Sequence, residues 1–504
     1  MEESCLIKLI AKQLTDNKIQ IKTLEQKQKL LMNMKSFFLI TAFILPAFFA
    51  NAQKTLTLQQ AIETGIKNNF DVLQSDLQMQ KAGVTLTQSK EEMLPNLNAN
   101  ADYGKNFGRS IDPFTNAFIN QKVGHSSYGA SSNLLLFNGF SLQNEIKSNR
   151  LGYEASKMEL QQAKDNLTIN IILAYLQVLS SEDVLKQSEE QVLVTQKQVD
   201  RLAILNNSGA ILPSDYYDLK GQLANEQIAI ADNKANLETA KLSLVQLLNI
   251  PYNKNLEVER MPEKDFNVNY SATPDSIYQT ALQEFAQVKA ANLRTESAER
   301  NIRAVKGELY PTLALGGTIN TSYSSVATRD YFVNTTEVPS TNYVNVNGAQ
   351  YPVIIKQDNY NSKKINYRDQ LSNNLYYTVD LGLTIPLFNA GRVRNQIKLA
   401  KIDFKNSELV EKHTKTQLQQ SIEQAYVNLT SASEKYKLLQ DQVSSFAESF
   451  RTAEIRFNAG AITSVDYLIA KNNLNRAESN LIIAKYDFVL RGKVLDYYGG
   501  KALW

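Results

Sequence analysis

The sequence predicts a mixed α/β membrane protein, internally duplicated, whose four β-strands per chain form part of a barrel shared by three copies. Three observations predict this fold class. Residues 375–385 alternate between apolar and polar side chains, as in a strand with one apolar face. Residues 142–206 hold no proline and a single glycine, which predicts a helix of about 100 Å. The same succession of elements occurs twice along the chain, and repeats of this kind are read before domains are counted.

The amino terminus has the pattern of a secretory signal. Met34 and Lys35 are followed by an apolar run, and small residues surround an expected cleavage after Ala52. A membrane anchor is the alternative, but the run is shorter than the ~20 residues that span a bilayer. We therefore expect a signal peptide at 34–52 and interpret residues 1–33, which contain the only cysteine, Cys5, as an extension from an upstream start codon. Without Cys5 the mature chain has no thiol for a lipid anchor.

The charge balance argues against nucleic acid as a partner. The formal net charge is +3, and this excess lies within residues 1–52, which hold seven lysines and four acidic residues. The rest of the chain is neutral overall, so it lacks the basic surface that nucleic acid binding requires.

The first half, residues 53–250, is expected to contain one helix, two strands and a long helical hairpin. The helix at 57–92 ends before Pro95, because proline cannot continue a helix. We expect strands at 97–107 and 128–137, a loop at 108–126 between them, a helix at 142–206, a turn at 206–213 and a helix from Tyr216. Eight of ten heptad positions from 216 to 247 are apolar, the exceptions being Glu226 and Asn233, which predicts packing against a neighbouring helix.

The second half, residues 275–498, repeats this plan after a proline-containing linker at 251–274. We expect a helix at 275–308, strands at 313–323 and 375–385, a long helix to 458, a turn and a last helix to Tyr498, with a short tail at 499–504. Gly209 and Gly460 are separated by the same 251 positions as Phe137 and Phe388. The second half has 35 additional residues between its strands, which we assign to a loop at 325–373.

The strands need partners from other chains. Each is about as long as a tilted membrane-spanning strand, yet four strands cannot close a barrel and open edges are not tolerated in lipid. Three copies would supply twelve strands. The alternative is a soluble antiparallel sheet on a helical body. In the barrel, the expected lumen-facing carboxylate is Asp380, beside Tyr376, Thr378 and Thr384, and the expected lipid-facing residues are Leu375, Tyr377, Val379, Leu381, Leu383 and Ile385.

Several motifs resemble the TolC-like outer-membrane efflux protein family. They are Leu94–Leu97 and Tyr310–Leu313 entering strands, Leu136–Gly139 and Ile385–Arg392 leaving them, and Arg456–Leu468 at a helical turn. The resemblance implies a homotrimer with a twelve-stranded barrel in the outer membrane of a Gram-negative bacterium and an α-helical tunnel in the periplasm. It implies a passive exit duct for tripartite efflux or type I secretion, with a periplasmic adaptor and an inner-membrane transporter docking at the tips.

The resemblance also assigns roles to residues at the helical turns, namely Gly209, Asp215, Arg456, Gly460 and Asp466. In the family, an acid six residues after the first turn glycine joins an aromatic and an arginine in a closing latch. Asp215 fits the acid, but Phe457 and Ile462 occupy the partner positions, so both hydrogen-bonding partners are missing. Asp466 would form a three-fold carboxylate ring that favours cations. The alternative is that Asp215 and Asp466 stabilise helix amino termini.

The sequence offers no catalytic motif and no cofactor site. His125 and His413 are the only histidines, and no Cys or His cluster has metal-ligand spacing. We expect a channel rather than an enzyme. A rival hypothesis is a periplasmic coiled-coil structural or adhesive protein without a pore. The sequence does not distinguish among drugs, metal ions and polypeptides as the transported substrate.

Overall fold

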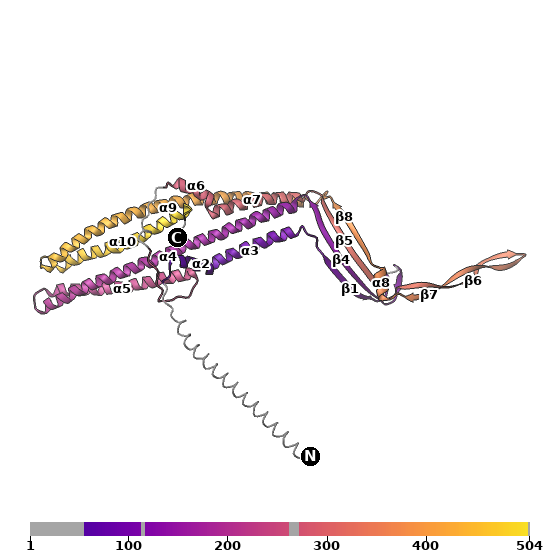
Figure 1. The fold of residues 1–504 in the computed structure, drawn as a ribbon, viewed down its shortest axis with the longest axis horizontal. Coiled ribbons are helices and arrows are strands. Elements are labelled where there is room, and N and C mark those ends of the chain that lie inside the picture. Colours follow the sequence, from indigo (N-terminus) through magenta and orange to yellow (C-terminus); the bar gives the residue numbers. More distant parts are fainter. Residues whose placement is uncertain (1–54, 112–115, 262–271, 502–504) are drawn as a thin grey trace, which may run out of the picture.

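The computed structural model describes residues 55–111, 116–261 and 272–501, and the molecule is strongly elongated (Figure 1). Long helices lie at one end, a four-stranded sheet follows, and a two-stranded ribbon extends beyond the sheet (Figure 1). The expected extension 1–33, the signal peptide 34–52 and residues 502–504 of the tail lie outside the described residues. Within the described part, none of the helices is both long and apolar enough to cross a membrane.

The four-stranded sheet is antiparallel throughout and draws two strands from each half of the chain. Its order is β1 (Asn98–Asn106), β4 (Val123–Asn138), β5 (Thr312–Ser324) and β8 (Tyr376–Thr384). The two halves therefore meet at the β4–β5 pair in the centre. β1 and β8 are the outer strands, so within the described chain each has one edge without a neighbouring strand.

The helices form two hairpins and two segmented partners. The hairpins are α4 (Ser141–Asn207) with α5 (Pro213–Leu248), and α9 (Arg392–Asn458) with α10 (Ser464–Tyr498). The partners are α2 (Leu58–Asn68) with α3 (Phe70–Glu91), and α6 (Pro274–Glu284) with α7 (Ala286–Gly307). At 67 residues each, α4 and α9 reach ~100 Å.

The prediction of one continuous helix at 57–92 and another at 275–308 is wrong, because each region forms two helices. Asn69 and Phe285 have extended backbones, with ψ of 129° and 123°, and each divides its helix in two. At Asn69 the cause is local, because its Oδ1 accepts hydrogen bonds from the N–H groups of Asp71 and Val72 and so begins a new helix. Apolar periodicity continues across both breaks and conceals them.

The offset of 251 residues also holds in three dimensions. α4 and α9 begin 251 residues apart and end 251 residues apart. Gly139 and Phe140 before α4 are both left-handed, and so are their counterparts Ala390 and Gly391 before α9. The same backbone turn thus leads from strand to long helix in both halves.

The main apolar core lies where α2, α4, α5 and α10 come together. Tyr175 of α4 is at its centre, 1% exposed. Its hydroxyl donates to the carbonyl oxygens of Leu56 and Glu259 at 2.9 and 2.7 Å. Residues 55–57 and the linker also meet through a parallel bridge between Leu56 and Val258. The buried hydroxyl therefore ties the start of the described chain to the linker between the halves.

The expected loop at 325–373 is wrong: most of it is a β-ribbon. β6 (Thr328–Val346) pairs with β7 (Ala349–Lys364), and the short helix α8 (Tyr367–Asn373) leads into β8. Asn347 and Gly348 form the turn, with φ of 50° and 87°, as a two-residue hairpin of this hand requires. The expected loop at 108–126 likewise contains β2 (Arg109–Ile111), β3 (Phe118–Asn120) and the start of β4, which begins at Val123.

Candidate functional site: the faces of the sheet and the turns of the helical hairpins

One face of the four-stranded sheet is mainly polar, with the pair Leu135 and Ala314 as an apolar exception. The register places Asp380 beside Gly316 and Asn133, and Thr378 beside Thr318. Across the strands this face carries Asn98, Asn100, Asp102, Ser127, Gly129, Ser131, Asn133, Gly316, Thr318, Asn320, Tyr376, Thr378, Asp380 and Thr384. These are the side chains that would line an aqueous lumen.

The opposite face is mainly apolar. Leu381 lies beside Leu315 and Leu134, and Tyr377 lies beside Ile319 and Ala130. The expected lipid-facing set is highly exposed in the single chain: Leu375 52%, Val379 77%, Leu381 64%, Leu383 62% and Ile385 55%. Leu375 and Ile385 flank β8, and the other three lie in it. An apolar face this exposed has no partner among the described residues.

Space for Asp380 comes from the neighbouring strand. A Cβ atom on Gly316 would lie 2.7 and 2.9 Å from the two carboxylate oxygens of Asp380. The absence of a side chain there leaves the carboxylate room on the polar face. The hydroxyls of Thr318 and Thr378 are 2.6 Å apart on the same face. These contacts fix how polar groups are spaced between β5 and β8.

The turns of the two helical hairpins have matching geometry. Gly209 and Gly460 have φ of 69° and 70°, which permits the left-handed turn after each long helix. The N–H groups of Ala210 and Ala461 donate to the carbonyl oxygens of Leu205 and Arg456 at 2.9 and 2.8 Å. Each turn therefore satisfies carbonyl groups that the helix end leaves free.

Asp466 stabilises the amino terminus of α10. Its carboxylate accepts a hydrogen bond from the N–H of Thr463, while the Thr463 hydroxyl accepts one from the N–H of Asp466 at 3.2 Å. This reciprocal pair is a capping box. The capping role proposed for Asp466 as an alternative is therefore present, and it leaves the carboxylate at the turn where a ring would form.

Asp215 contacts the other hairpin rather than its own helix start. Its Oδ1 accepts from the N–H of Ser464 at 3.4 Å, and the Ser464 hydroxyl donates to Asp218 at 2.9 Å. Arg201, near the end of α4, donates to the side chain and to the carbonyl oxygen of Asn458, the last residue of α9. The distance to the carbonyl oxygen is 3.2 Å. These contacts join the hairpins where the family's latch would lie.

The remaining residues of that region have packing roles. Phe457 stacks on Tyr467 with ring centres 4.7 Å apart, and Ile462 is partly buried beside them. Arg456 is exposed. Burial raises the pKa of the Tyr467 hydroxyl. Phe457, which occupies the position of a latch partner, therefore makes an aromatic stacking contact with Tyr467.

A buried ion pair also joins the hairpins. Lys471 of α10 donates to Glu226 of α5 at 2.8 Å, with side chains 3% and 8% exposed. Thr195 of α4 accepts from Lys471 and donates to Glu226, and Gln222 donates to Glu226 at 3.0 Å. Burial lowers the pKa of Lys471, and the hydrogen bond and charge of Glu226 act in the opposite direction.

These polar contacts explain both exceptions in the heptad pattern. Glu226 forms the ion pair, and Asn233 donates to the hydroxyl of Ser188 at 2.7 Å. The sequence analysis missed Asp218, Ser464, Arg201, Thr195 and Lys471. Glu226 and Asn233, polar residues at apolar heptad positions, indicated that a buried polar partner exists. Their positions do not identify the partner residue on the other helix.

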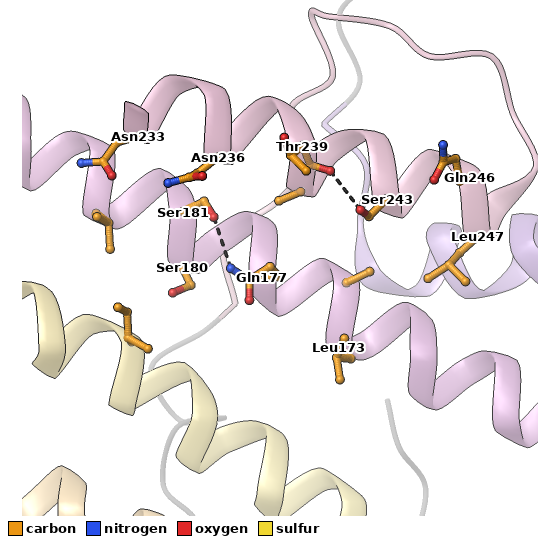
Figure 2. Close-up of a pocket in the computed structure, with 14 residues that line it drawn as sticks. Leu173, Gln177, Ser180, Ser181, Asn233, Asn236, Thr239, Ser243, Gln246 and Leu247 are labelled. Atoms are coloured by element: carbon orange, nitrogen blue, oxygen red, sulfur yellow. Dashed lines mark hydrogen bonds between the residues drawn. The ribbon is translucent and has the colours of Figure 1, made fainter. Parts of the chain in front are cut away.

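A groove of about 790 Å³ runs between α4 and α5 (Figure 2). Small and polar side chains dominate its lining, including Ser180, Ser181, Asn236, Thr239 and Ser243. Several of these bond within their own helix: Gln177 donates to Ser181 at 3.4 Å and Ser243 to the Thr239 carbonyl at 3.0 Å (Figure 2). The lining leaves room for a closely approaching surface.

The described residues contain no group of three or more His, Cys, Asp or Glu side chains placed to hold a metal ion. The polar groups of the sheet and turns are instead distributed along an extended surface. Such a surface can guide solutes and contact other proteins.

Comparisons with known proteins agree with this architecture. The sequence model described as outer membrane efflux protein matches residues 61–249 and 277–491. The chain is 22% identical over 452 residues to outer membrane protein TolC of Escherichia coli K12, covering 88% of this chain and 82% of that protein. It is 19% identical over 444 residues to toxin and drug export protein A of Aggregatibacter actinomycetemcomitans, covering 86% and 84%. A CusC crystal structure superposes with a TM-score of 0.70 at 17% identity, covering 90% and 94%, so the fold is shared.

Proposed function

The chain belongs to the outer membrane efflux protein family, and from this membership we propose that three copies assemble into one continuous exit duct across the outer membrane and periplasm. As a family member it is an outer-membrane protein of efflux, with its helices on the periplasmic side. The finer proposal is a twelve-stranded barrel, continued by a tunnel of six helical hairpins, that conducts substrates passively.

The observation that carries the proposal is the division of the sheet into a polar and an apolar face, combined with two free edges. In a closed twelve-stranded barrel, β8 of one copy pairs with β1 of the next, so that every backbone group is satisfied. The apolar face then lies in lipid and Asp380 in the lumen. A pore-free coiled-coil protein would leave this exposed apolar face without a role.

The helical hairpins fit the periplasmic part of such a duct. The groove between α4 and α5 has small, polar and aliphatic side chains in its lining, and we place a helix of the next copy there. At the tips, the turns near Gly209 and Gly460 are proposed to meet a periplasmic adaptor and an inner-membrane transporter, which supplies the energy. Three copies of Asp466 would surround the tunnel entrance. Contacts of Asp215 and Arg201 with the second hairpin would hold this entrance narrow.

A pair of neighbouring substitutions tests the duct. Val379→Lys places a charge on the proposed lipid face and costs ~2–4 kcal/mol near the bilayer midplane, whereas Thr378→Lys places the same charge in the lumen. We expect the unboiled wild-type and Thr378→Lys proteins to migrate as trimers and to conduct in planar bilayers, with reduced cation preference for Thr378→Lys. Val379→Lys should give little inserted trimer. Equal behaviour of the two variants, or a monomeric wild type without conductance, would contradict the proposal.

A further inference from the structure

The ribbon formed by β6 and β7 carries a mainly apolar face at its outer half, interrupted by Ser340 and Asn342 where the register shifts between Pro339 and Tyr343. Odd-numbered residues of β7 share one face, because side chains alternate along a strand. Val344 pairs with Tyr351, Val346 with Ala349 and Val338 with Ile355. With Val353, these residues make up what we call the ribbon face: Val338, Val344, Val346, Ala349, Tyr351, Val353 and Ile355.

The ribbon face is uncharged and open to solvent in the single chain. Among the described residues, Tyr351 is 58% exposed and Val344 54%. The opposite face is mixed, with the pairs Asn345–Gln350 and Glu337–Lys356 beside Tyr343 and Ile354. An uncharged and mainly apolar surface on one side only is the pattern of a sheet that packs on that side.

The ribbon also lacks support of its own. It projects beyond the four-stranded sheet as two strands alone (Figure 1). An isolated two-stranded hairpin is marginally stable in water and usually requires further strands or a packed apolar face. A 19-residue strand paired with a 16-residue strand therefore points to a second surface that covers it.

The position at which the ribbon joins the four-stranded sheet indicates which surface covers the ribbon face. β6 begins four residues after β5 ends, and the chain returns through α8 directly into the edge strand β8. Gln370 of α8 is 1% exposed, and it accepts from the N–H of Ser324 and donates to its carbonyl oxygen, at 2.9 and 3.0 Å, so the root is held firmly against β5. In the proposed trimer, β8 is the strand that joins the next copy. The ribbons of three copies then rise from one rim at equal height.

We infer that the ribbon faces of three copies pack against one another outside the membrane and form a trimeric apolar contact beyond the barrel. The inference rests on the proposed trimer and adds to it a second assembly surface, separate from the barrel strands and the helices. An uncharged face offers no complementarity to a charged partner, whereas three symmetric copies present identical apolar faces to one another.

Cysteine cross-linking tests the contact. In a Cys5→Ser background, Tyr351→Cys places a thiol on the ribbon face, and Gln350→Cys places one on the opposite face of the same strand. Purified trimer is treated with a short thiol-reactive bifunctional linker, and a maleimide reports thiol accessibility. We expect Tyr351→Cys to give covalently linked chains and slow labelling, and Gln350→Cys to label fast without linking.

The control readouts separate this inference from the proposed function. If both variants are conducting trimers but Tyr351→Cys labels as fast as Gln350→Cys and does not link, the ribbon face is uncovered in the trimer and the inference is overturned, while the duct stands. If Tyr351→Cys fails to link in the purified trimer and its labelling is slow only on intact cells, a different molecule covers the ribbon face. That result would also overturn the inference. Absence of any trimer or conductance would overturn the proposed function itself.

Discussion

Replacing Lys471 by methionine should loosen the two helical hairpins from each other near their turns. Methionine keeps the unbranched shape of the side chain but removes the charge that pairs with Glu226 at 2.8 Å. Glu226 is 7% exposed, so its carboxylate would stay buried with hydrogen bonds from Thr195 and Gln222 but no opposite charge. Removal of one partner of a buried ion pair costs ~3–5 kcal/mol.

The double variant Glu226→Met with Lys471→Met should recover most of this loss. The other groups keep partners without the ion pair: Thr195 can donate to the carbonyl oxygen of Gln191 at 3.1 Å, and Gln222 to Asn472 at 3.0 Å. Two apolar side chains of similar volume would then fill the site. Such replacements are often neutral or stabilising, so we expect the double variant to be at least as stable as the wild type to within ~1 kcal/mol.

Amide hydrogen exchange in the purified, detergent-solubilised protein measures this difference locally. A loss of ~3–5 kcal/mol in opening free energy raises exchange by roughly 100- to 4,000-fold, since each ~1.4 kcal/mol is a factor of ten. The increase should be confined to peptides around residues 191–230 and 464–475 and be absent near the sheet. Wild-type exchange in Lys471→Met, or equally fast exchange in the double variant, would refute the reasoning.

Three further substitutions test other parts of the molecule. Asp466→Asn should reduce the cation selectivity of single channels, and unchanged selectivity would count against the proposed carboxylate ring; the Asn side-chain oxygen can still accept from the N–H of Thr463, the N-cap residue, so folding is preserved. Ser464→Ala removes a donor to Asp218, costs ~1 kcal/mol and should raise the fraction of time the channel is open, while an unchanged open fraction would show that this contact does not hold the entrance. Gly316→Ala would place a Cβ within 2.7 Å of the Asp380 carboxylate, so we expect a lower thermal stability of the trimer and altered conductance; a wild-type melting temperature would contradict this.

The parts of the fold that depend on local periodicity could be predicted from the sequence. The strand at 375–385 and the long helix at 142–206 lie within two residues of the observed β8 and α4, because alternation and uninterrupted helical pattern are properties of neighbouring residues. The break at Asn69 was missed because one capping side chain is a weaker signal than the apolar repeat around it. The ribbon was missed although Asn347-Gly348 between Val- and Ile-containing runs is a strong hairpin signal.

The contacts between hairpins could not be predicted, for a physical reason. Glu226 and Lys471 are 245 residues apart in sequence, and their contact depends on the relative rotation of three helices, which no local pattern determines. The resemblance directed attention to Asp215, Phe457 and Ile462 by their distance from the turn glycines, and of these Asp215 contacts the other hairpin through the N–H of Ser464. The structure places further polar links at Ser464, the first residue of α10, and at Lys471, about two helical turns farther along. In this chain the hairpins are therefore joined by a buried charge pair within the helical layer as well as by hydrogen bonds at its tip.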